Sequence, residues 1–299
     1  MTADARDIKG VGVLGCGLMG AGIAQVCATA GYRTLVHDVE PAQLARGRAS
    51  LEKSLAKLVE KSKVSAAQRD AALGHLSYTT DLGALAGSDL IIEAVTEDLA
   101  IKNRLWAELD SLCGPNAIFA SNTSSLPIKA MATVTRRPDR FVGLHFFNPV
   151  PLMPLVEIVR ADATSLETFE RSLAFVRSLG KETVVARDTP GFLVNLLLVP
   201  YLLDAVRALE RGVGSIADID TAMRLGCGHP MGPFTLLDVV GNDTTLRIAD
   251  IMLGEYRDAR YEAPALLRRL VAEGRYGRKS GKGFYDYAVD PPVPLSSEQ

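Results

Sequence analysis

Cysteine is scarce in this 299-residue chain, and its spacing excludes the common cysteine-based sites. The four cysteines, Cys16, Cys27, Cys113 and Cys227, are scattered and form neither a CxxC pair nor a Cys/His ligand pattern. We therefore expect no metal site. The expected state of all four is the reduced, buried thiol of a cytoplasmic protein.

A long apolar run is also missing. The longest one, LLLVPYLLDAV from Leu196, contains a proline and is too short to cross a bilayer. The first ten residues, MTADARDIKG, lack the apolar core of a secretion signal. These two absences predict neither export nor a membrane span.

Neither sign of charge is in large excess. The chain has 33 Lys+Arg against 35 Asp+Glu, a formal net charge of −2, so a general electrostatic grip on nucleic acid is not expected. Small molecules are the expected partners. Hydrophobic residues make up 47% and charged residues 23%, which is ordinary for a globular protein, and the length favours two domains over one.

Short apolar runs alternate with helical patterns from Ile8 to about Arg187. This alternation predicts an α/β fold built from βαβ units around a parallel sheet. The expected strands are 11–15, 32–38, 89–95, 117–121, 141–146, 155–160 and 182–187.

The pattern changes after RDTPG, residues 187–191. The segments behind it have helical periodicity without strand runs, and glycines at 212, 214, 226, 228 and 241 would separate several helices. We therefore expect a Rossmann-like domain at residues 1–187 and an all-α domain at residues 188–299, with Asp188 as the boundary candidate.

The segment GVLGCGLMGAGIA carries Gly15, Gly17 and Gly20 in G-x-G-x-x-G spacing between an expected strand and an expected helix. In this context Gly15 permits a tight turn, Gly17 lets the backbone approach a pyrophosphate, and Gly20 lets helix pack on strand. Leu18 and Met19, within the same motif, are expected to contact the cofactor as well. A tight strand-to-helix turn without a ligand is the alternative.

Asp38 stands at the end of the next expected strand, where a carboxylate can accept hydrogen bonds from both ribose hydroxyls. The same carboxylate would repel a 2′-phosphate. NAD is therefore the expected cofactor, in preference to NADP.

One of only four histidines, His145, lies in GLHFFNPVP, and Glu157 follows in the apolar run LVEIV. A carboxylate among apolar neighbours is costly to bury without a partner, and an imidazole from a neighbouring strand would be one. Such a pair beside nicotinamide could move a proton while hydride moves. The alternatives are a core or loop histidine, and a glutamate on the solvent face of an edge strand.

The segment from Pro41 to Lys63 is expected to form a helix with six basic side chains and only two acidic ones, within a chain whose net charge is −2. Ser54, Lys57 and Lys61 fall on one helical face at i, i+3 and i+7, so an anionic ligand could bind there. A merely solvated face is the alternative.

Several long motifs occur together and in order: GCGLMGAGIA, FASNTSSLPI, GLHFFNPVPLMPLVEIV, DTPGFLVN and GRKSGKGFYDY. In this combination, from Val11 to about Tyr287, the chain resembles the 3-hydroxyacyl-CoA dehydrogenases, particularly the stand-alone 3-hydroxybutyryl-CoA dehydrogenases. The resemblance implies an NAD-dependent enzyme that interconverts short-chain L-3-hydroxyacyl-CoA and 3-ketoacyl-CoA, with a helical domain that forms a homodimer.

The resemblance also implies roles for individual residues. His145 would be the acid/base and Glu157 its orienting partner, with Ser124 and Asn195 near the substrate oxygen. The NAD site would include Glu97, Lys102, Ser124, Asn148 and Lys279, and the coenzyme A site Ser54, Lys61 and Ser124. From position alone, Asn195 could be an ordinary polar residue near a helix start or could face a cleft between domains, and Lys279 could be a solvated lysine.

Three rival functions can be weighed on the same residues. A dehydrogenase of free sugar acids with a lysine as acid/base is disfavoured by the His145/Glu157 pair. A relative with the same pair that acts on a free sugar acid such as gulonate is disfavoured by the basic helix. A non-enzymatic dinucleotide sensor would be expected to have lost a catalytic position, and none is lost here.

Overall fold

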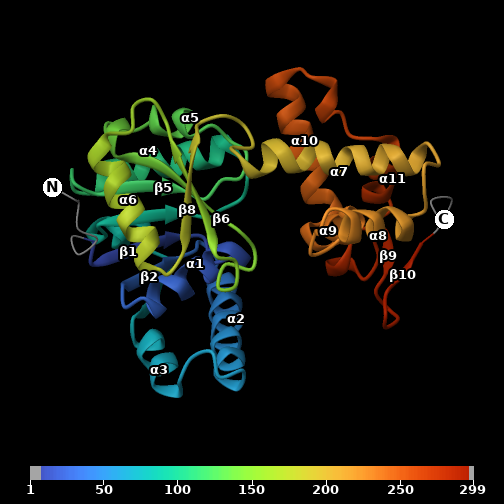
Figure 1. Cartoon of the computed structure of the whole chain (residues 1–299). Helices are drawn as coiled ribbons and strands as arrows, with labels where there is room; N and C mark the ends of the chain where they lie inside the picture. Colours follow the sequence, from blue (N-terminus) through green and yellow to red (C-terminus); the bar gives the residue numbers. More distant parts are fainter. Residues whose placement is uncertain (1–7, 296–299) are drawn as a thin grey trace. The chain divides into compact units, whose positions relative to one another are not determined.

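The computed structural model describes residues 8–295, which form two compact units, Met1–Phe192 and Leu193–Gln299. Unit 1 is a twisted sheet with helices on both faces, and unit 2 is mainly helical (Figure 1). The fold class predicted from sequence is therefore confirmed. The placement of the domain boundary at Asp188 stays a prediction.

Unit 1 contains one eight-stranded sheet with the order β3-β2-β1-β4-β5-β6-β7-β8. Its strands are β1 (Gly10–Leu14), β2 (Arg33–His37), β3 (Leu76–Thr79), β4 (Leu90–Glu93), β5 (Ile118–Ser121), β6 (Phe141–Phe146), β7 (Leu155–Arg160) and β8 (Glu182–Arg187). Its α-helices are α1 (Leu18–Thr29), α2 (Pro41–Glu60), α3 (Ala66–Gly74), α4 (Leu99–Leu112), α5 (Ile128–Ala132) and α6 (Leu166–Ser178). The order reverses between β1 and β4, and ligands of such sheets bind outside the carboxyl ends of the strands at that point.

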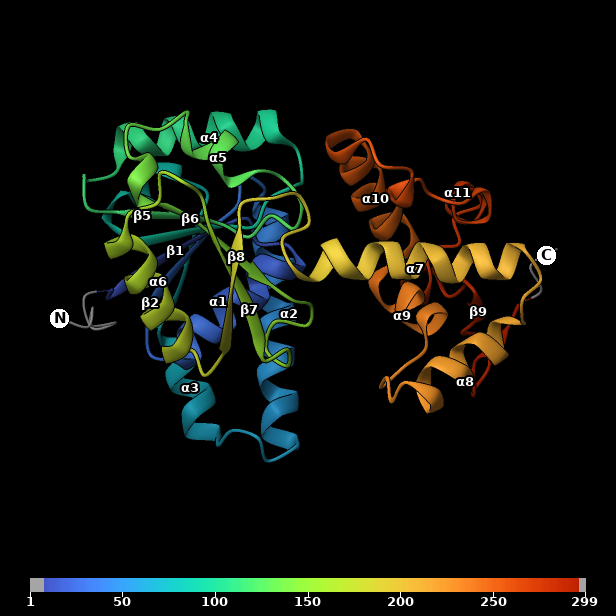
Figure 2. The same ribbon diagram turned by 45° about the horizontal axis from the view of Figure 1, so that its top comes forward.

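Both faces of the sheet are covered, so the central strands are buried along their whole length. Helices α1 and α6 pack on one face, with α2 and α3 beside α1, and α4 and α5 lie over the other face (Figure 2). In β1, Val11 and Val13 belong to the α1-side core, whereas Leu14 belongs to the α4-side core. Strands buried on both faces are continuous apolar runs in the sequence, which is why the central strands could be located.

Two features of this sheet differ from the sequence prediction. The edge strand β3 was not expected, because its residues LSYT are only partly buried and form no apolar run. The sheet is mainly parallel, as predicted, but β6 and β7 run antiparallel. The physical reason is the short connection 147–154, which has no room for the crossover helix that parallel neighbours need.

Unit 2 is built around one long helix. Its α-helices are α7 (Val194–Glu210), α8 (Ile216–Gly226), α9 (Pro233–Val240), α10 (Asn242–Tyr256) and α11 (Ala265–Ala272). Helix α7 packs against α9, α10 and α11, and the expected glycine breaks fall between or at the ends of these helices. The all-α expectation missed a short hairpin of β9 (Tyr285–Asp286) and β10 (Val293–Pro294), whose strands are too short to give a periodic signal.

Two smaller expectations also need correction. Cys16, Cys27 and Cys113 are buried free thiols, as expected, but Cys227 is exposed because it ends α8 in an open loop. The basic helix α2 ends at Glu60 rather than Lys63, because Ser62 adopts a positive φ of 53°. Within the described residues, no helix combines the length and apolarity needed to cross a membrane.

Candidate active site

The Gly-rich loop lies at the carboxyl end of β1, where the sheet order reverses. Gly15 has a φ of 97°, which disfavours other residues, and a Cβ on Gly20 would lie 1.9 Å from the Gly15 carbonyl oxygen. A Cβ on Gly17 would meet nothing within 4 Å, so the loop backbone there borders open space. Gly17 caps α1 without a side-chain hydrogen bond, which leaves the helix start suited to a phosphate group.

Asp38 lies just beyond β2, beside this loop. Its Oδ2 accepts a hydrogen bond from the Cys16 amide at 2.8 Å, and its Oδ1 accepts one from the Glu40 amide at 3.1 Å. The carboxylate is thus held at the carboxyl edge next to the glycine turn, in the place that a ribose-binding acid occupies in dinucleotide folds. These residues fit a bound NAD.

Helix α2 packs directly on the Gly-rich loop, a contact that the sequence analysis missed. A Cβ on Gly47 would lie 2.3 Å from Cys16 Sγ, so only glycine allows this approach. Gln43 Nε2 also donates a hydrogen bond to the Cys16 carbonyl at 2.8 Å. The helix that carries Ser54 and Lys61 is therefore fixed to the loop that carries Gly15 and Gly17.

His145 and Glu157 form a direct pair. They are register partners in the antiparallel ladder of β6 and β7, and both project to the α4 and α5 side of the sheet because their neighbours Leu144 and Ile158 lie in the opposite core. His145 Nδ1 lies 2.6 Å from Glu157 Oε2, and Glu157 is fully buried. Because β7 lies between β6 and β8, the edge-strand interpretation of Glu157 is wrong.

Glu97 lies at the centre of a hydrogen-bonded cluster under the loop that carries Ser124. Its Oε1 accepts hydrogen bonds from the Thr123 hydroxyl at 2.5 Å and from the Ser124 amide at 3.0 Å. Burial would raise the pKa of Glu97, but Lys102 and these hydrogen bonds outweigh it and lower the pKa. Glu97 is therefore an anion that orders the Ser124 loop.

Lys102 is buried, whereas a lysine that contacts a cofactor from the surface would be exposed. Its side chain is 1% exposed, and its Nζ lies 2.5 Å from Glu93 Oε1 and 3.2 Å from Glu97 Oε2. Glu93 is fully buried and also accepts a hydrogen bond from the Ser121 hydroxyl at 2.6 Å. Sequence reasoning missed Glu93, although it stands in the apolar run DLIIEAV and gives the same signal as Glu157.

The other predicted site residues lie in four separate places. Asn148 is exposed in the connection after β6, and Ser124 is partly buried between β5 and α5. Asn195 is buried in the first turn of α7 in unit 2. Lys279, also in unit 2, pairs with Asp243 at 2.6 Å.

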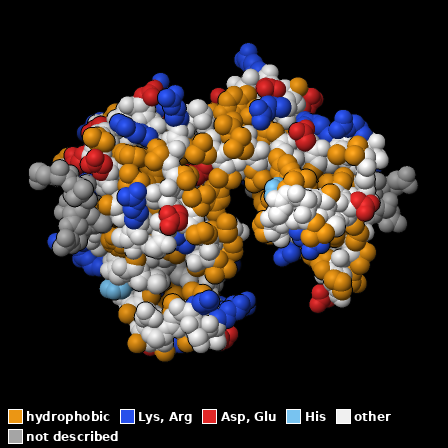
Figure 3. Space-filling view, viewed as in Figure 1, with side chains coloured by type: hydrophobic (Ala, Val, Ile, Leu, Met, Phe, Trp, Pro, Cys, Tyr) orange, Lys and Arg blue, Asp and Glu red, His pale blue; other side chains and the backbone are white. Residues whose placement is uncertain are grey.

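The basic face of α2 is open to solvent. Lys57 and Lys61 are exposed and Ser54 is partly exposed, while Leu51 and Leu55 on the opposite side of the helix are buried. Lysine and arginine side chains gather along the lower part of this helix (Figure 3). The exposed lysines are therefore accessible from solvent.

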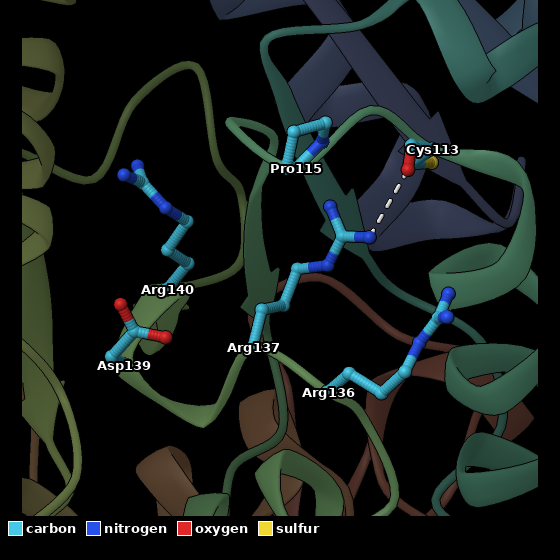
Figure 4. Close-up of a pocket in the computed structure, with 6 residues that line it drawn as sticks. All are labelled: Cys113, Pro115, Arg136, Arg137, Asp139 and Arg140. Atoms are coloured by element: carbon cyan, nitrogen blue, oxygen red, sulfur yellow. Dashed lines mark hydrogen bonds between the residues drawn. The ribbon is translucent and has the colours of Figure 1, made fainter.

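A pocket of about 380 Å³ lies at the opposite, amino-terminal edge of the sheet, just before β6. Figure 4 shows the residues that line it, which are Cys113, Pro115, Arg136, Arg137, Asp139 and Arg140. Arg140 points away from Arg136 and Arg137, and Arg137 donates a hydrogen bond to the Cys113 carbonyl at 3.1 Å. Arg136 and Arg137 are already paired with the carboxylate of Asp110, which occupies part of the positive charge of this pocket.

These arginines stabilise unit 1 through Asp110. Its carboxylate accepts hydrogen bonds from Arg136 Nε at 2.8 Å and from Arg137 Nε at 2.7 Å. Burial would raise the pKa of Asp110, but the hydrogen bonds from both arginines outweigh it and lower the pKa. A carboxyl group with a lowered pKa stabilises the fold above the unfolded-state pKa of about 3.9, and the stabilisation disappears as pH falls through the folded-state pKa.

We therefore expect Asp110→Asn to reduce the stability of unit 1 by about 1.5 to 3 kcal/mol at pH 7, the usual worth of hydrogen bonds to charged groups. The difference from the wild type should shrink as pH falls below about 4. Urea unfolding followed by the fluorescence of Trp106, the only tryptophan and a neighbour of this cluster, measures both effects. Asp139→Asn, at an exposed position in the same pocket, is the control and should change the free energy of unfolding little. If Asp110→Asn loses the same stability at every pH, the ion-pair explanation is wrong.

The fold and the Gly-rich loop define the class of this protein, a Rossmann-like dinucleotide-binding protein with an added helical unit. Residues 10–189 match the NAD binding domain of 3-hydroxyacyl-CoA dehydrogenase, and residues 191–287 match its C-terminal domain. The chain therefore belongs to the 3-hydroxyacyl-CoA dehydrogenase family, and its first unit is the NAD-binding domain.

Individual relatives agree with this assignment. The chain is 48% identical over 282 residues to the 3-hydroxybutyryl-CoA dehydrogenase of Mycobacterium tuberculosis strain H37Rv, covering 94% of this chain and 99% of the relative. It is 47% identical over 295 residues to human mitochondrial hydroxyacyl-coenzyme A dehydrogenase, covering 96% and 94%.

Two crystal structures of similar proteins share the fold. M. tuberculosis FadB2 superimposes with a TM-score of 0.92 at 48% identity, covering 94% of this chain and 99% of that chain. The (S)-3-hydroxybutyryl-CoA dehydrogenase PaaH1 from Ralstonia eutropha gives a TM-score of 0.89 at 41% identity, with the same coverage.

Proposed function

We propose that this protein interconverts short-chain L-3-hydroxyacyl-CoA and 3-ketoacyl-CoA, with 3-hydroxybutyryl-CoA and acetoacetyl-CoA as the preferred pair. The observation that carries the proposal is the contact of 2.6 Å between His145 Nδ1 and Glu157 Oε2 at the carboxyl edge of an NAD-binding sheet. The names of the relatives support the substrate class.

When bound, NAD supplies the acceptor or donor of hydride. In the direction of reduction, His145 as imidazolium donates a proton from Nε2 to the substrate oxygen, and in oxidation the neutral ring takes that proton back. Glu157 accepts the hydrogen bond from Nδ1, which fixes the tautomer and stabilises the imidazolium. Ser124 is proposed to hydrogen-bond the substrate oxygen.

The substrate class can be tested directly. NADH oxidation is followed with acetoacetyl-CoA, a longer 3-ketoacyl-CoA and free acetoacetate, and oxidation of gulonate is assayed with NAD. We expect acetoacetyl-CoA to be used far better than free acetoacetate, because remote binding of the coenzyme A moiety supports the chemistry. Preferred turnover of gulonate would replace the proposal by the sugar-acid alternative, and no turnover of any substrate would favour a sensor.

Asp38 should set the preference for NAD. We expect Asp38→Ala to weaken NADH binding and to narrow the difference between NADH and NADPH, because the carboxylate binds ribose hydroxyls and repels a 2′-phosphate. Fluorescence titration with both coenzymes measures the two affinities. Equal turnover of the wild type with NADH and NADPH would reject the assignment.

Lys61 should contribute to coenzyme A binding from the exposed face of α2. We expect Lys61→Ala to raise the KM for acetoacetyl-CoA by about 1.5- to 5-fold, with a smaller effect on kcat, because exposed charge pairs are weak. The increase should diminish at high ionic strength. Lys9→Ala, which removes an exposed lysine at the other end of the sheet, is the matched control; equal KM values for Lys61→Ala and the wild type at low salt would remove Lys61 from the site.

We also propose that the protein forms a homodimer through its helical unit and resides in the cytoplasm. Exposed apolar side chains on α7, α8 and α9 support the first, namely Leu197, Leu225, Val239 and Val240. The four free thiols support the second. Light scattering of the purified protein measures the oligomeric state, and a monomer at micromolar concentration would contradict the dimer.

A further inference from the structure

The imidazole of His145 is contacted by two aromatic rings as well as by Glu157. The ring of Phe147 lies 4.5 Å from it, centroid to centroid, with an interplanar angle of 52°. The ring of Phe192 lies 5.8 Å away at 59°. Neither phenylalanine has a role in the proton transfer proposed above.

The two rings come from different segments of unit 1. Phe147 follows His145 by two residues at the end of β6, whereas Phe192 ends the segment that follows β8. In that segment Gly191 has a φ of 83° and the Phe192 amide donates a hydrogen bond to the Thr189 carbonyl at 2.9 Å, which closes a tight turn around Pro190 and Gly191.

Phe192 is held in an unusual backbone conformation. Its φ is 50°, in the left-handed region that bulky residues rarely adopt, and its side chain is buried with 1% exposure. Such a conformation persists only where the surroundings fix it, and it occurs often at functional sites. Here the buried ring, in the same core as Ile128 and Phe141, fixes it.

A single hydrogen bond does not fix the orientation of an imidazole, because the ring can still turn about its Nδ1 contact and its χ2 angle is broad. General acid/base catalysis depends on the position of the proton-carrying atom, and a small displacement of that atom can cost a large factor in rate. Glu157 occupies Nδ1, so the direction of Nε2 depends on what touches the ring itself.

We infer that Phe147 and Phe192 are positioning residues for His145, which hold the imidazole so that Nε2 keeps one direction. This inference deepens the proposed function and rests on it. Because the rings act through the position of the imidazole, replacing them should lower kcat and leave substrate affinity nearly unchanged.

The kinetic test replaces each ring by an aliphatic side chain of smaller volume. We expect Phe192→Leu and Phe147→Leu to lower kcat about 10-fold, with KM for acetoacetyl-CoA and NADH within about twofold of the wild type. Phe192→Tyr, which keeps the ring, should retain most of kcat. The matched control is Phe175→Leu, which removes a fully buried ring that packs on Tyr32 at 5.1 Å in the other core of unit 1.

Phe175→Leu should lower the melting temperature at least as much as Phe192→Leu while leaving kcat at 25 °C unchanged. If Phe192→Leu and Phe147→Leu lose no more turnover than Phe175→Leu, the rings only stabilise the fold and the inference is wrong. If Phe192→Leu does not fold, Phe147→Leu decides the question, because Phe147 is partly exposed and contributes less to the core.

A second measurement does not depend on activity. The chain has only four histidines, so the ¹³C-labelled imidazole signals can be assigned by the loss of one signal in His145→Gln. We expect the His145 signals to be displaced by the neighbouring rings and to move in Phe147→Leu and Phe192→Leu but not in Phe175→Leu. Unmoved signals would overturn the positioning inference even if the enzyme is active, whereas moved signals in a protein without dehydrogenase activity would overturn the proposed function alone.

Discussion

Replacing His145 by glutamine is expected to lower kcat for NADH-dependent reduction of acetoacetyl-CoA by about 10²-fold or more, the usual size of general acid/base assistance. Glutamine fills a similar volume but cannot carry a proton to the substrate oxygen. The coenzyme is proposed to bind at the Gly-rich loop that follows β1, so the NADH dissociation constant should stay within about twofold of the wild type. Stopped-flow single-turnover rates together with NADH fluorescence titration separate the two quantities.

The direction of the reaction provides an independent check on the same residue. In the proposed mechanism reduction needs the imidazolium and oxidation needs neutral imidazole, so the wild-type rates in the two directions should depend on pH in opposite senses. His145→Gln should remove this dependence from both directions. Turnover near that of the wild type in His145→Gln would show that another group moves the proton.

The second large effect is expected from Glu157→Gln, which should lower kcat about 10²-fold with little change in either KM. An amide of the same shape cannot stabilise the imidazolium as a carboxylate does. Because an amide can donate as well as accept a hydrogen bond, it also no longer fixes the tautomer that carries the proton on Nδ1. Because Glu157 is fully buried and lies 2.6 Å from His145 Nδ1, solvent cannot take its place.

A double-mutant cycle tests whether the two residues act as one unit. His145→Gln with Glu157→Gln should be little slower than His145→Gln alone, since the carboxylate acts through the imidazole. Circular dichroism and melting temperatures of the three variants control for loss of folding. If the fold-losses in kcat of the two single variants multiply in the double variant, Glu157 has a role separate from His145.

Local chemistry explains which parts of the site the sequence could reveal. The Gly-rich turn was recognisable because the tight turn at Gly15 and the close packing at Gly20 each demand glycine. Glu157 was recognisable because a carboxylate inside an apolar run demands a partner. Its pairing with His145 followed only once β6 and β7 were known to be antiparallel neighbours in that register.

The parts that could not be predicted depend on tertiary contacts that no sequence pattern encodes. The Glu93–Lys102–Glu97 cluster joins β4, α4 and the segment between them, and no pattern in a single sequence shows that Lys102 is buried there. Nothing in the helical pattern of residues 41–63 indicates that Gly47 lies against Cys16. Edge strand β3 lacks the apolar run that marks strands buried on both faces.

The antiparallel pairing of β6 and β7 also affects which chimeras of two related enzymes keep a matched acid/base pair. His145 and Glu157 are 12 residues apart and belong to adjoining strands, so a crossover outside 141–160 passes both to a chimera from the same parent. The Gly-rich loop contacts α2 where Cys16 lies against Gly47, and these two residues are much farther apart in sequence. A crossover between them therefore takes the loop from one parent and the helix from the other. Chimeras of related dehydrogenases should therefore lose coenzyme binding through mismatched packing at this contact more readily than they lose a matched acid/base pair.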